Sequence, residues 1–241
     1  MRILALDAAL TRCSAAVVVD DVVVASQLGA PGVDGAGRGQ SALLPGMAEA
    51  VLAKAGLRAS ELDLIAVTVG PGSFTGIRAG LALAHGMALA ASIPVIGVTV
   101  GEALAEALPR LGGRILWSAV NSRRGRVFLE WVSGPDRAIE ACALDALPDP
   151  GRAVAIAGDA AIAVAAGLAA RGADVMLSDA RLPQIRHVAL AAAKRWRGGL
   201  PARPALPVYV DAPEAKLPAG GLRPAPESDV PPEIDVPRET M

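Results

Sequence analysis

Residues Leu64–Ala91 read LIAVTV GPGSFTGIRAG LALAHGMALAA, and this stretch decides the fold. Its first six residues form an apolar run typical of a buried strand. The glycine-rich turn that follows leads into a helix that begins near Thr75. Three glycines lie inside this helix, and each costs about 1 kcal/mol relative to alanine. We therefore expect something closely packed against the helix to compensate for them.

Small residues recur every four positions in this helix and form one smooth stripe: Gly76, Gly80, Ala84 and Ala88. One interpretation is that the stripe lies tightly on the protein's own sheet, or that it reflects only an alanine-rich composition. The sharper interpretation, which we adopt as the prediction, is a surface kept bare for a partner or a nucleotide.

Two larger side chains lie at the start of the same helix. Phe74 is costly to leave in solvent, since the chain has only six aromatic residues. It either fills an interface between subdomains or anchors a partner. Arg78, one turn further along, is either a solvated charge or an ion-pair partner across an interface.

The composition limits the function classes. The formal net charge is −1 and there is no long basic tract, which argues against a chain that grips nucleic acid on its own. We interpret the small basic cluster over residues 123–126 as a solvated hairpin turn, with direct RNA binding as the alternative.

The sequence also bears on the location of the protein. Two cysteines are too few for a disulfide framework, and Asp7 interrupts the N-terminal apolar run before it reaches the length of a signal-peptide core. Because the longest apolar runs are shorter than the roughly 20 residues that span a bilayer, we expect a cytoplasmic protein and no membrane segment.

The order of elements repeats along the chain. Each half is predicted to begin with antiparallel strands and to continue with alternating strand and helix, which is an α/β arrangement. The first half contains strands over 2–7, 14–20, 22–28, 64–70 and 94–98, and helices over 40–55, 75–91 and 99–108. The second half contains strands over 114–120, 126–132, 138–143, 153–157 and 174–177, helices ending at 171 and spanning 183–197, and an extended segment over 206–210. We expect an N-terminal subdomain (1–100), a C-terminal subdomain (101–212) and a disordered proline-rich tail (213–241).

Five blocks of sequence resemble a known family. MRILALDAAL, VTVGPGSFTGIRAGLALAHGMALA, IPVIGVTV, AVNSRRGRVFLEWV and LPVYVDAPEAKLP follow one another in the order found in the TsaB (YeaZ-type) family. The resemblance covers residues 1 to about 217, and its GPGSFTGIRAG block is specific. It implies an actin-like, Hsp70-like and sugar-kinase-like (ASKHA) α/β fold with two related subdomains.

The resemblance also implies a role. Members of this family act as a non-catalytic partner of TsaD, the subunit that transfers threonylcarbamoyl to the adenosine beside the anticodon of certain tRNAs. The ATPase TsaE joins them, tRNA is met only through the complex, and the chain forms a homodimer when alone. The partner surface would be built from the helices over 40–55 and 75–91. The residues expected to bind the partner are Leu44, Met47, Phe74, Gly76, Arg78, Gly80, Ala84 and Ala88.

Nucleotide binding is the second possible property of the sequence. Asp7 ends the first strand, where the superfamily holds a magnesium-bound phosphate, although an Asp after a strand is also an ordinary turn residue. The family pattern continues Asp-Thr, whereas this chain has Asp7-Ala8-Ala9 and lacks that hydroxyl. Gly158 and Asp159 occupy the equivalent turn of the second half, where a plain turn is the alternative. We expect no tightly bound cofactor, with ATP or ADP and magnesium bound weakly or at the partner interface as the open alternative.

The spacing of the histidines bears on metal binding. The two histidines, His85 and His187, lie about a hundred residues apart, each without a ligand at metal-binding spacing. We therefore expect no metal site and place a glycoprotease-type metallopeptidase below the partner function. An ATP-dependent phosphotransferase of the same superfamily remains the other alternative.

Overall fold

The computed structural model describes residues 1–29, 40–108, 110–122, 125–133, 138–201 and 203–210. The predicted tail over 213–241, and Arg123 and Arg124 of the predicted basic turn, lie outside the described residues.

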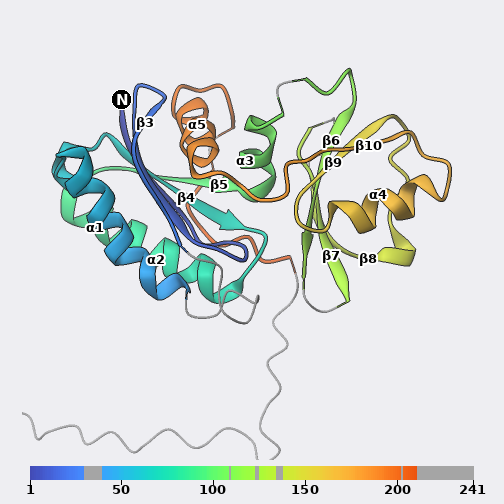
Figure 1. Ribbon diagram of the computed structural model, residues 1–241, viewed down its shortest axis with the longest axis horizontal. Helices are drawn as coiled ribbons and strands as arrows, with labels where there is room; N and C mark the ends of the chain where they lie inside the picture. The colour runs from blue at the N-terminus through green and yellow to red at the C-terminus, as the bar shows by residue number, and fades with distance from the viewer. Residues whose placement is uncertain (30–39, 109, 123–124, 134–137, 202, 211–241) are drawn as a thin grey trace, which may run out of the picture. The chain divides into compact units, whose positions relative to one another are not determined.

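Two five-stranded mixed sheets with the same strand order form the framework (Figure 1). The first sheet, in the order β3-β2-β1-β4-β5, contains β1 (Arg2–Asp7), β2 (Ser14–Val19), β3 (Val22–Leu28), β4 (Leu64–Gly70) and β5 (Val95–Thr99). The second, in the order β8-β7-β6-β9-β10, contains β6 (Ile115–Asn121), β7 (Arg126–Trp131), β8 (Ile139–Ala143), β9 (Val154–Ala157) and β10 (Val175–Leu177). In each sheet three antiparallel strands lie beside two parallel ones. The predicted repeat in the order of elements is therefore confirmed.

The helices begin and end where local chemistry favours it. They are α1 (Leu44–Ala55), α2 (Phe74–Ala91), α3 (Val100–Glu106), α4 (Ala161–Ala169) and α5 (Ile185–Trp196), with short 3-10 turns at Gln40–Leu43, Ala59–Glu61 and Leu144–Ala146. Gly56 ends α1 in the left-handed conformation, with φ of 65°. Thr99 and Glu102 form the predicted capping box at the start of α3, with hydrogen bonds of 3.1 and 3.0 Å.

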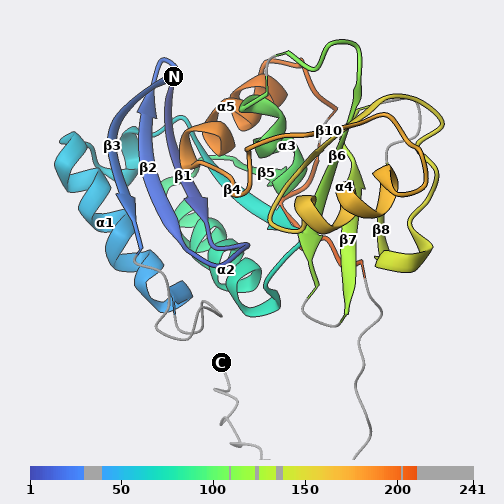
Figure 2. The same ribbon diagram turned by 45° about the vertical axis from the view of Figure 1, so that its right-hand side comes forward.

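Helices cover both faces of the first sheet (Figures 1 and 2). The strands alternate accordingly: Leu4 and Leu6 pack in the core with α1 and α2, whereas Ile3 and Ala5 pack in the core with α5. Helix α5 follows β10 in the chain, yet it contacts β1, β2, β4 and β5 of the first sheet. The second sheet packs one face against α4 through a core that includes Trp117.

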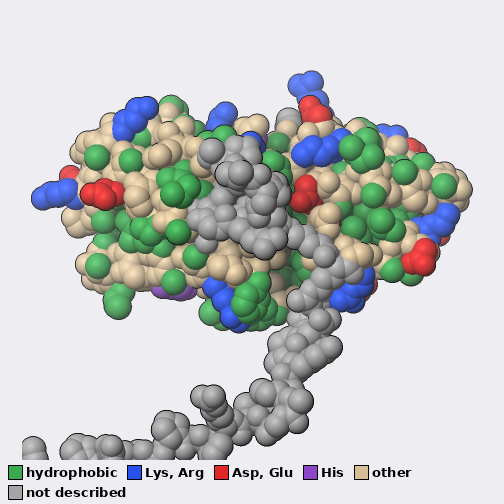
Figure 3. All heavy atoms as spheres, turned by 60° about the horizontal axis from the view of Figure 1, so that its bottom comes forward, with side chains coloured by type: hydrophobic (Ala, Val, Ile, Leu, Met, Phe, Trp, Pro, Cys, Tyr) green, Lys and Arg blue, Asp and Glu red, His purple; other side chains and the backbone are tan. Residues whose placement is uncertain are grey.

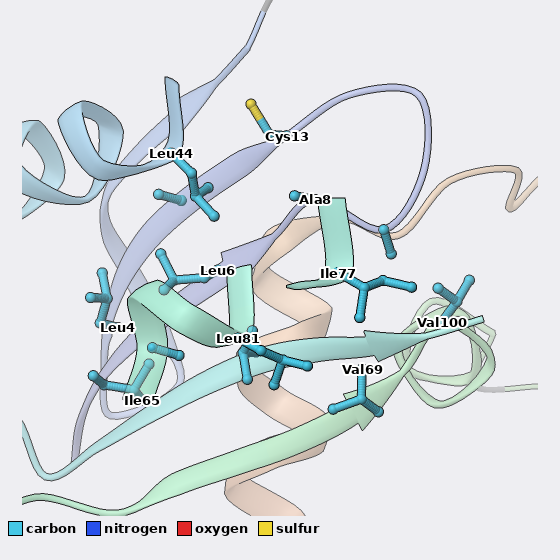
Figure 4. Packing of buried hydrophobic residues seen from close by; sticks show 14 of the residues in the cluster. Leu4, Leu6, Ala8, Cys13, Leu44, Ile65, Val69, Ile77, Leu81 and Val100 are labelled. Carbon is cyan, nitrogen blue, oxygen red and sulfur yellow. The ribbon is translucent and has the colours of Figure 1, made fainter. Parts of the chain in front are cut away.

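The stripe on α2 faces the protein's own sheet. Figure 4 shows Ile77 and Leu81 on the side of α2 that meets β4, and both are buried. The four stripe residues lie on the same side and are buried as well: Gly76, Gly80, Ala84 and Ala88. A Cβ added to Gly80 would lie 3.6 Å from Val67 Cγ2 and 3.8 Å from Leu44 Cδ2. The prediction of a bare surface stripe is therefore wrong, and the helix packs tightly on its own sheet.

The two residues of α1 expected at the partner surface are also inside. Leu44 is 0% and Met47 3% exposed, and the Met47 sulfur lies 3.5 Å from Cys13 Sγ. Both side chains belong to the core between α1 and the first sheet. Burial on the sheet therefore removes Leu44 and Met47 from the exposed surface of the chain.

Candidate functional site

The turn between β4 and α2 closes on the loop that follows β1. Ser73 N donates a 2.6 Å hydrogen bond to the carbonyl oxygen of Ala9. A Cβ on Gly72 would lie 2.1 Å from that same oxygen, and a Cβ on Gly76 would lie 2.0 Å from Ala8 O. The glycines of the GPGSFTG motif therefore allow one backbone to lie directly on another. The side chain of Ser73 caps α2 by accepting a 3.2 Å hydrogen bond from Gly76 N.

Asp7 is turned inward at the end of β1. Its Oδ1 accepts hydrogen bonds from Ala9 N at 3.0 Å and from the Thr68 hydroxyl at 2.7 Å. The side chain is buried, and burial raises the pKa of its carboxyl group. This geometry is that of a turn residue that ties β1 to β4. A phosphate contact by Asp7 stays a prediction.

The corresponding turn of the second half is built in the same way. Gly158 has φ of 105°, and a Cβ there would lie 2.2 Å from Ala119 O. Asp159 Oδ1 accepts a 2.8 Å hydrogen bond from Asn121 N at the end of β6. Gly158 and Asp159 thus form a tight turn against β6, and their predicted nucleotide contact is likewise untested.

Phe74 and Arg78 form an exposed cluster with a residue from the far end of the chain. The Arg78 guanidinium carbon lies 3.6 Å from the centroid of the Phe74 ring, a cation–π arrangement. Arg78 Nε and Nη2 donate hydrogen bonds to the Tyr209 hydroxyl at 3.1 and 2.8 Å. Phe74 and Tyr209 remain 59% and 58% exposed. Exposure argues against Phe74 as a filler of an interface between subdomains, and its role as a partner anchor stays a prediction.

Residues 203–210, which we name the C-terminal strap, lie against β4, β5 and α2. Val208 N donates a 2.8 Å hydrogen bond to Val69 O, and His85 Nε2 lies 2.8 Å from Ala205 O. Ala205 is buried, and a Cβ on Gly97 would lie 3.0 Å from Pro204 O. The expected extended segment over 206–210 thus holds Tyr209 at α2, without joining a sheet.

The outward side of α2 carries a row of exposed side chains. Its residues follow helical spacing, and we name the set the exposed α2 face: Phe74, Arg78, Ala82, His85 and Leu89. Leu89 is 84% exposed beside a shallow hollow of about 440 Å³. Figure 3 views the side of the molecule on which α1 and α2 lie, where hydrophobic side chains are spread among a few charged ones. Phe74 and Leu89, at the two ends of this face, are the large apolar side chains of α2 that are exposed, and exposed apolar side chains favour a protein interface.

Two properties of the residues that the structure describes bear on metal binding and on the membrane. Within that part of the chain, no group of three or more His, Cys, Asp or Glu side chains is placed to hold a metal ion. Helix α2 is the one described helix long and apolar enough to cross a membrane by length and composition, and its buried side packs on the first sheet.

Sequence comparisons connect the chain with two kinds of protein. The family model of TsaD, tRNA N6-adenosine threonylcarbamoyltransferase, matches residues 34–128. The tRNA threonylcarbamoyladenosine biosynthesis protein TsaB of Escherichia coli is 35% identical over 130 residues, which are 53% of each chain. The tRNA N6-adenosine threonylcarbamoyltransferase of Granulibacter bethesdensis is 49% identical over 80 residues, 32% of this chain and 22% of that one. The chain thus spans about half the length of that TsaB and less of the transferase.

Solved structures agree on the fold. YeaZ from Pseudomonas aeruginosa is 24% identical and covers 86% of this chain and 100% of its own, with a TM-score of 0.64. A second Pseudomonas aeruginosa structure, described as similar to peptidase YEAZ, is 23% identical and covers 87% of this chain and 99% of its own, with a TM-score of 0.66. The expected α/β fold with a repeated strand order is therefore confirmed, and it is the fold of these YeaZ structures. The chain is therefore similar in sequence to TsaB proteins over about half of its length, and similar in fold to the YeaZ structures.

Proposed function

We propose that the chain is a non-catalytic subunit in the biosynthesis of threonylcarbamoyladenosine in tRNA, and that it docks onto a TsaD-type transferase through the exposed α2 face. Its relatives in Escherichia coli and Haemophilus influenzae are named as biosynthesis proteins of this modification. The observation that carries the docking surface is the cluster of Phe74, Arg78 and Tyr209. Aromatic residues and arginine are the side chains most enriched in the energetic centres of protein interfaces.

A partner of related fold suits this surface. The segment matched by the TsaD family model, residues 34–128, contains both α1 and α2. A TsaD-type protein therefore has counterparts of these helices. Two chains with equivalent helices can pack face to face about an approximate two-fold axis, as identical subunits do. The same reasoning makes a homodimer the state we propose for the chain alone, with TsaE and tRNA joining only the complex in the cytoplasm.

The nucleotide part of the proposal rests on Asp7. Both hydrogen bonds to its Oδ1 come from the chain itself, and the Ala8–Ala9 backbone lies on the glycine turn. We propose that the isolated chain holds no cofactor tightly, and that ATP or ADP with magnesium binds weakly or at the interface with the partner. Sustained hydrolysis of magnesium-ATP by the isolated chain would contradict the non-catalytic role.

The test is light scattering on size exclusion with the chain and the TsaD-type transferase of the same organism. We expect a heterodimer with the unchanged chain. Leu89→Glu places a charge at the C-terminal end of the exposed α2 face, at a side chain whose burial in the proposed contact as leucine is worth roughly 2 kcal/mol. Affinity should therefore fall at least about tenfold. The matched control is Ile162→Glu on α4, which is an exposed apolar residue of the other half at 62% exposure.

The control separates the outcomes. Loss of binding in Leu89→Glu with normal binding in Ile162→Glu supports the exposed α2 face. Equal binding by all three chains means that the interface lies elsewhere. Failure of the unchanged chain to form any complex, with nucleotide and TsaE present, contradicts the partner function.

A further inference from the structure

A glutamate of the second sheet is bonded to the first half of the chain. Glu130 lies on β7 and is 4% exposed. Its Oε2 accepts a 3.0 Å hydrogen bond from Gly101 N in α3, and its Oε1 accepts a hydrogen bond from the hydroxyl of Thr99, the last residue of β5. Both oxygens of one carboxyl group are therefore used to join β7 to the corner between β5 and α3.

This contact is closely packed and largely apolar. A Cβ on Gly101 would lie 2.4 Å from Glu130 Oε2 and 2.5 Å from Val132 Cγ2. Val100 and Leu104 of α3 belong to the same buried cluster as Leu116 and Val120 of β6 and as Val132, the residue after β7. The carboxyl group of Glu130 is therefore enclosed by the hydrophobic contact between the two halves.

The charged groups around Glu130 form ion pairs mainly with one another. Glu102 Oε1 forms ion pairs with Arg195 of α5 and, at 3.3 Å, with Arg203 of the C-terminal strap. Glu102 Oε2 accepts a 3.0 Å hydrogen bond from Thr99 N. Among the described residues, no Lys, Arg or His forms an ion pair with Glu130. Glu130 thus lies in a buried cluster without a cation of its own.

Burial makes the protonated form of this carboxyl group favourable. Desolvation raises the pKa of Glu130 to about 7, and the negative charge of Glu102 acts in the same direction. The bonds from Thr99 and Gly101 and the charge of Arg203 act in the opposite direction. The carboxyl group therefore changes charge near neutral pH while the contact is closed.

We propose that Glu130 is a proton-linked latch between the two halves: closing its contact with the β5–α3 corner takes up a proton, and opening, which returns the carboxyl group to water, releases it. The latch rests on the packing and bonding of Glu130 and does not depend on the proposed partner function. With pKa values of about 7 in the closed state and 4.5 in water, the opening equilibrium constant rises roughly 70-fold between pH 5 and pH 8.

The test is amide hydrogen exchange of the full chain, followed by NMR from pH 5 to pH 8. Each rate is divided by the intrinsic exchange rate at that pH. Protection of the Gly101 amide should fall roughly 70-fold over this range, and in Glu130→Gln, which resembles the protonated form, it should change less than about twofold. A flat profile in the unchanged chain, or the same slope in Glu130→Gln, would overturn the proposal.

Two further measurements keep the test decisive. The amide of Val17, in the middle of β2, must stay better protected than Gly101, since equal rates would mean that Glu130 reports global unfolding rather than a latch. Arg203→Gln removes a charge that lowers the pKa of Glu130 and should move the transition to higher pH. The matched control Arg197→Gln, whose partner is the exposed Asp21, should leave it in place. If Glu130→Gln does not fold, the proposal is contradicted when the pH dependence of Gly101 protection in Arg203→Gln is the same as in the unchanged chain.

Discussion

The three glycines of α2 make one prediction that can be worked out in detail. Three variants each replace one of these glycines by alanine, so that each adds one methyl group at a different position of the same helix. The helix propensity gain is about 1 kcal/mol at Gly80 and Gly86 in the helix interior, and no larger than that at Gly76 in the first turn. The surroundings differ: the added Cβ would lie 2.0 Å from Ala8 O at Gly76, 3.6 Å from Val67 Cγ2 at Gly80, and more than 4 Å from any neighbour at Gly86.

These distances order the three variants. Gly86→Ala should raise the free energy of unfolding by about 0.5–1 kcal/mol, because nothing opposes the propensity gain. Gly80→Ala makes ordinary van der Waals contacts and should lie between no change and a gain of about 1 kcal/mol. In Gly76→Ala the backbone at Ala8 must move by about 1 Å, which costs roughly 1–3 kcal/mol as overpacking and about 1 kcal/mol more if the Ser73–Ala9 hydrogen bond breaks. After the propensity gain, a net loss of about 0–2 kcal/mol remains if that hydrogen bond survives, and of about 1–3 kcal/mol if it breaks.

Urea unfolding, followed by circular dichroism and tryptophan fluorescence, measures all three differences. Gly86→Ala serves as the internal control for helix propensity. If Gly76→Ala were as stable as Gly86→Ala, the close approach of the Ala8–Ala9 loop to the glycine turn would not be the reason for the motif. A strong loss in Gly86→Ala would instead mean that the outward side of α2 is covered in the protein.

Two further predictions concern side chains at the site. In Asp7→Asn, the amide oxygen can still accept from Ala9 N and Thr68, and the cost of burying a charge disappears. Because burial raises the pKa of Asp7, the unchanged chain loses stability as pH rises through that pKa. The melting temperature of the variant should therefore be higher than that of the unchanged chain at pH 8 and equal to it near pH 3. A lower melting temperature of the variant at pH 8 contradicts the turn role. Tyr209→Phe removes the acceptor for Arg78 at an exposed position, so stability should change by less than about 1 kcal/mol while affinity for the transferase falls several-fold. Unchanged affinity by titration calorimetry would remove the strap from the interface.

The strands and their repeated order follow from local signals. Apolar runs ending at Asp7 and Gly70, and paired aspartates with positive φ between β2 and β3, fix the element bounds within a residue or two. The stripe on α2 could not be assigned in this way. Spacing shows that four small residues share one face, but the face that meets the sheet depends on where the turn aims the helix. The sequence therefore predicted the closeness of packing and missed its direction.

The contacts of Tyr209 and Glu130 could not be predicted because they join distant parts of the chain. Tyr209 reaches a helix 131 residues earlier, and Glu130 meets Thr99 across 31 residues and two different sheets. Tyr209 offered one signal, as the chain's single tyrosine in a segment expected to be extended. Glu130 offered a weaker one, since it is a charge in a strand that is otherwise mainly apolar.

The return of α5 to the first sheet has a consequence for synthesis on the ribosome. Ile3, Ala5, Ala16 and Val18 form a face that packs in one core cluster with α5 residues such as Val188 and Ala192, and α5 contacts both β1 and β2. That face remains open to solvent from the time β1 and β2 emerge until residue 196 has left the exit tunnel. Nascent chains in this interval present an uncovered apolar sheet, which is the kind of surface that chaperones hold and that aggregates when unprotected. The first half to be translated is therefore among the last to complete its core.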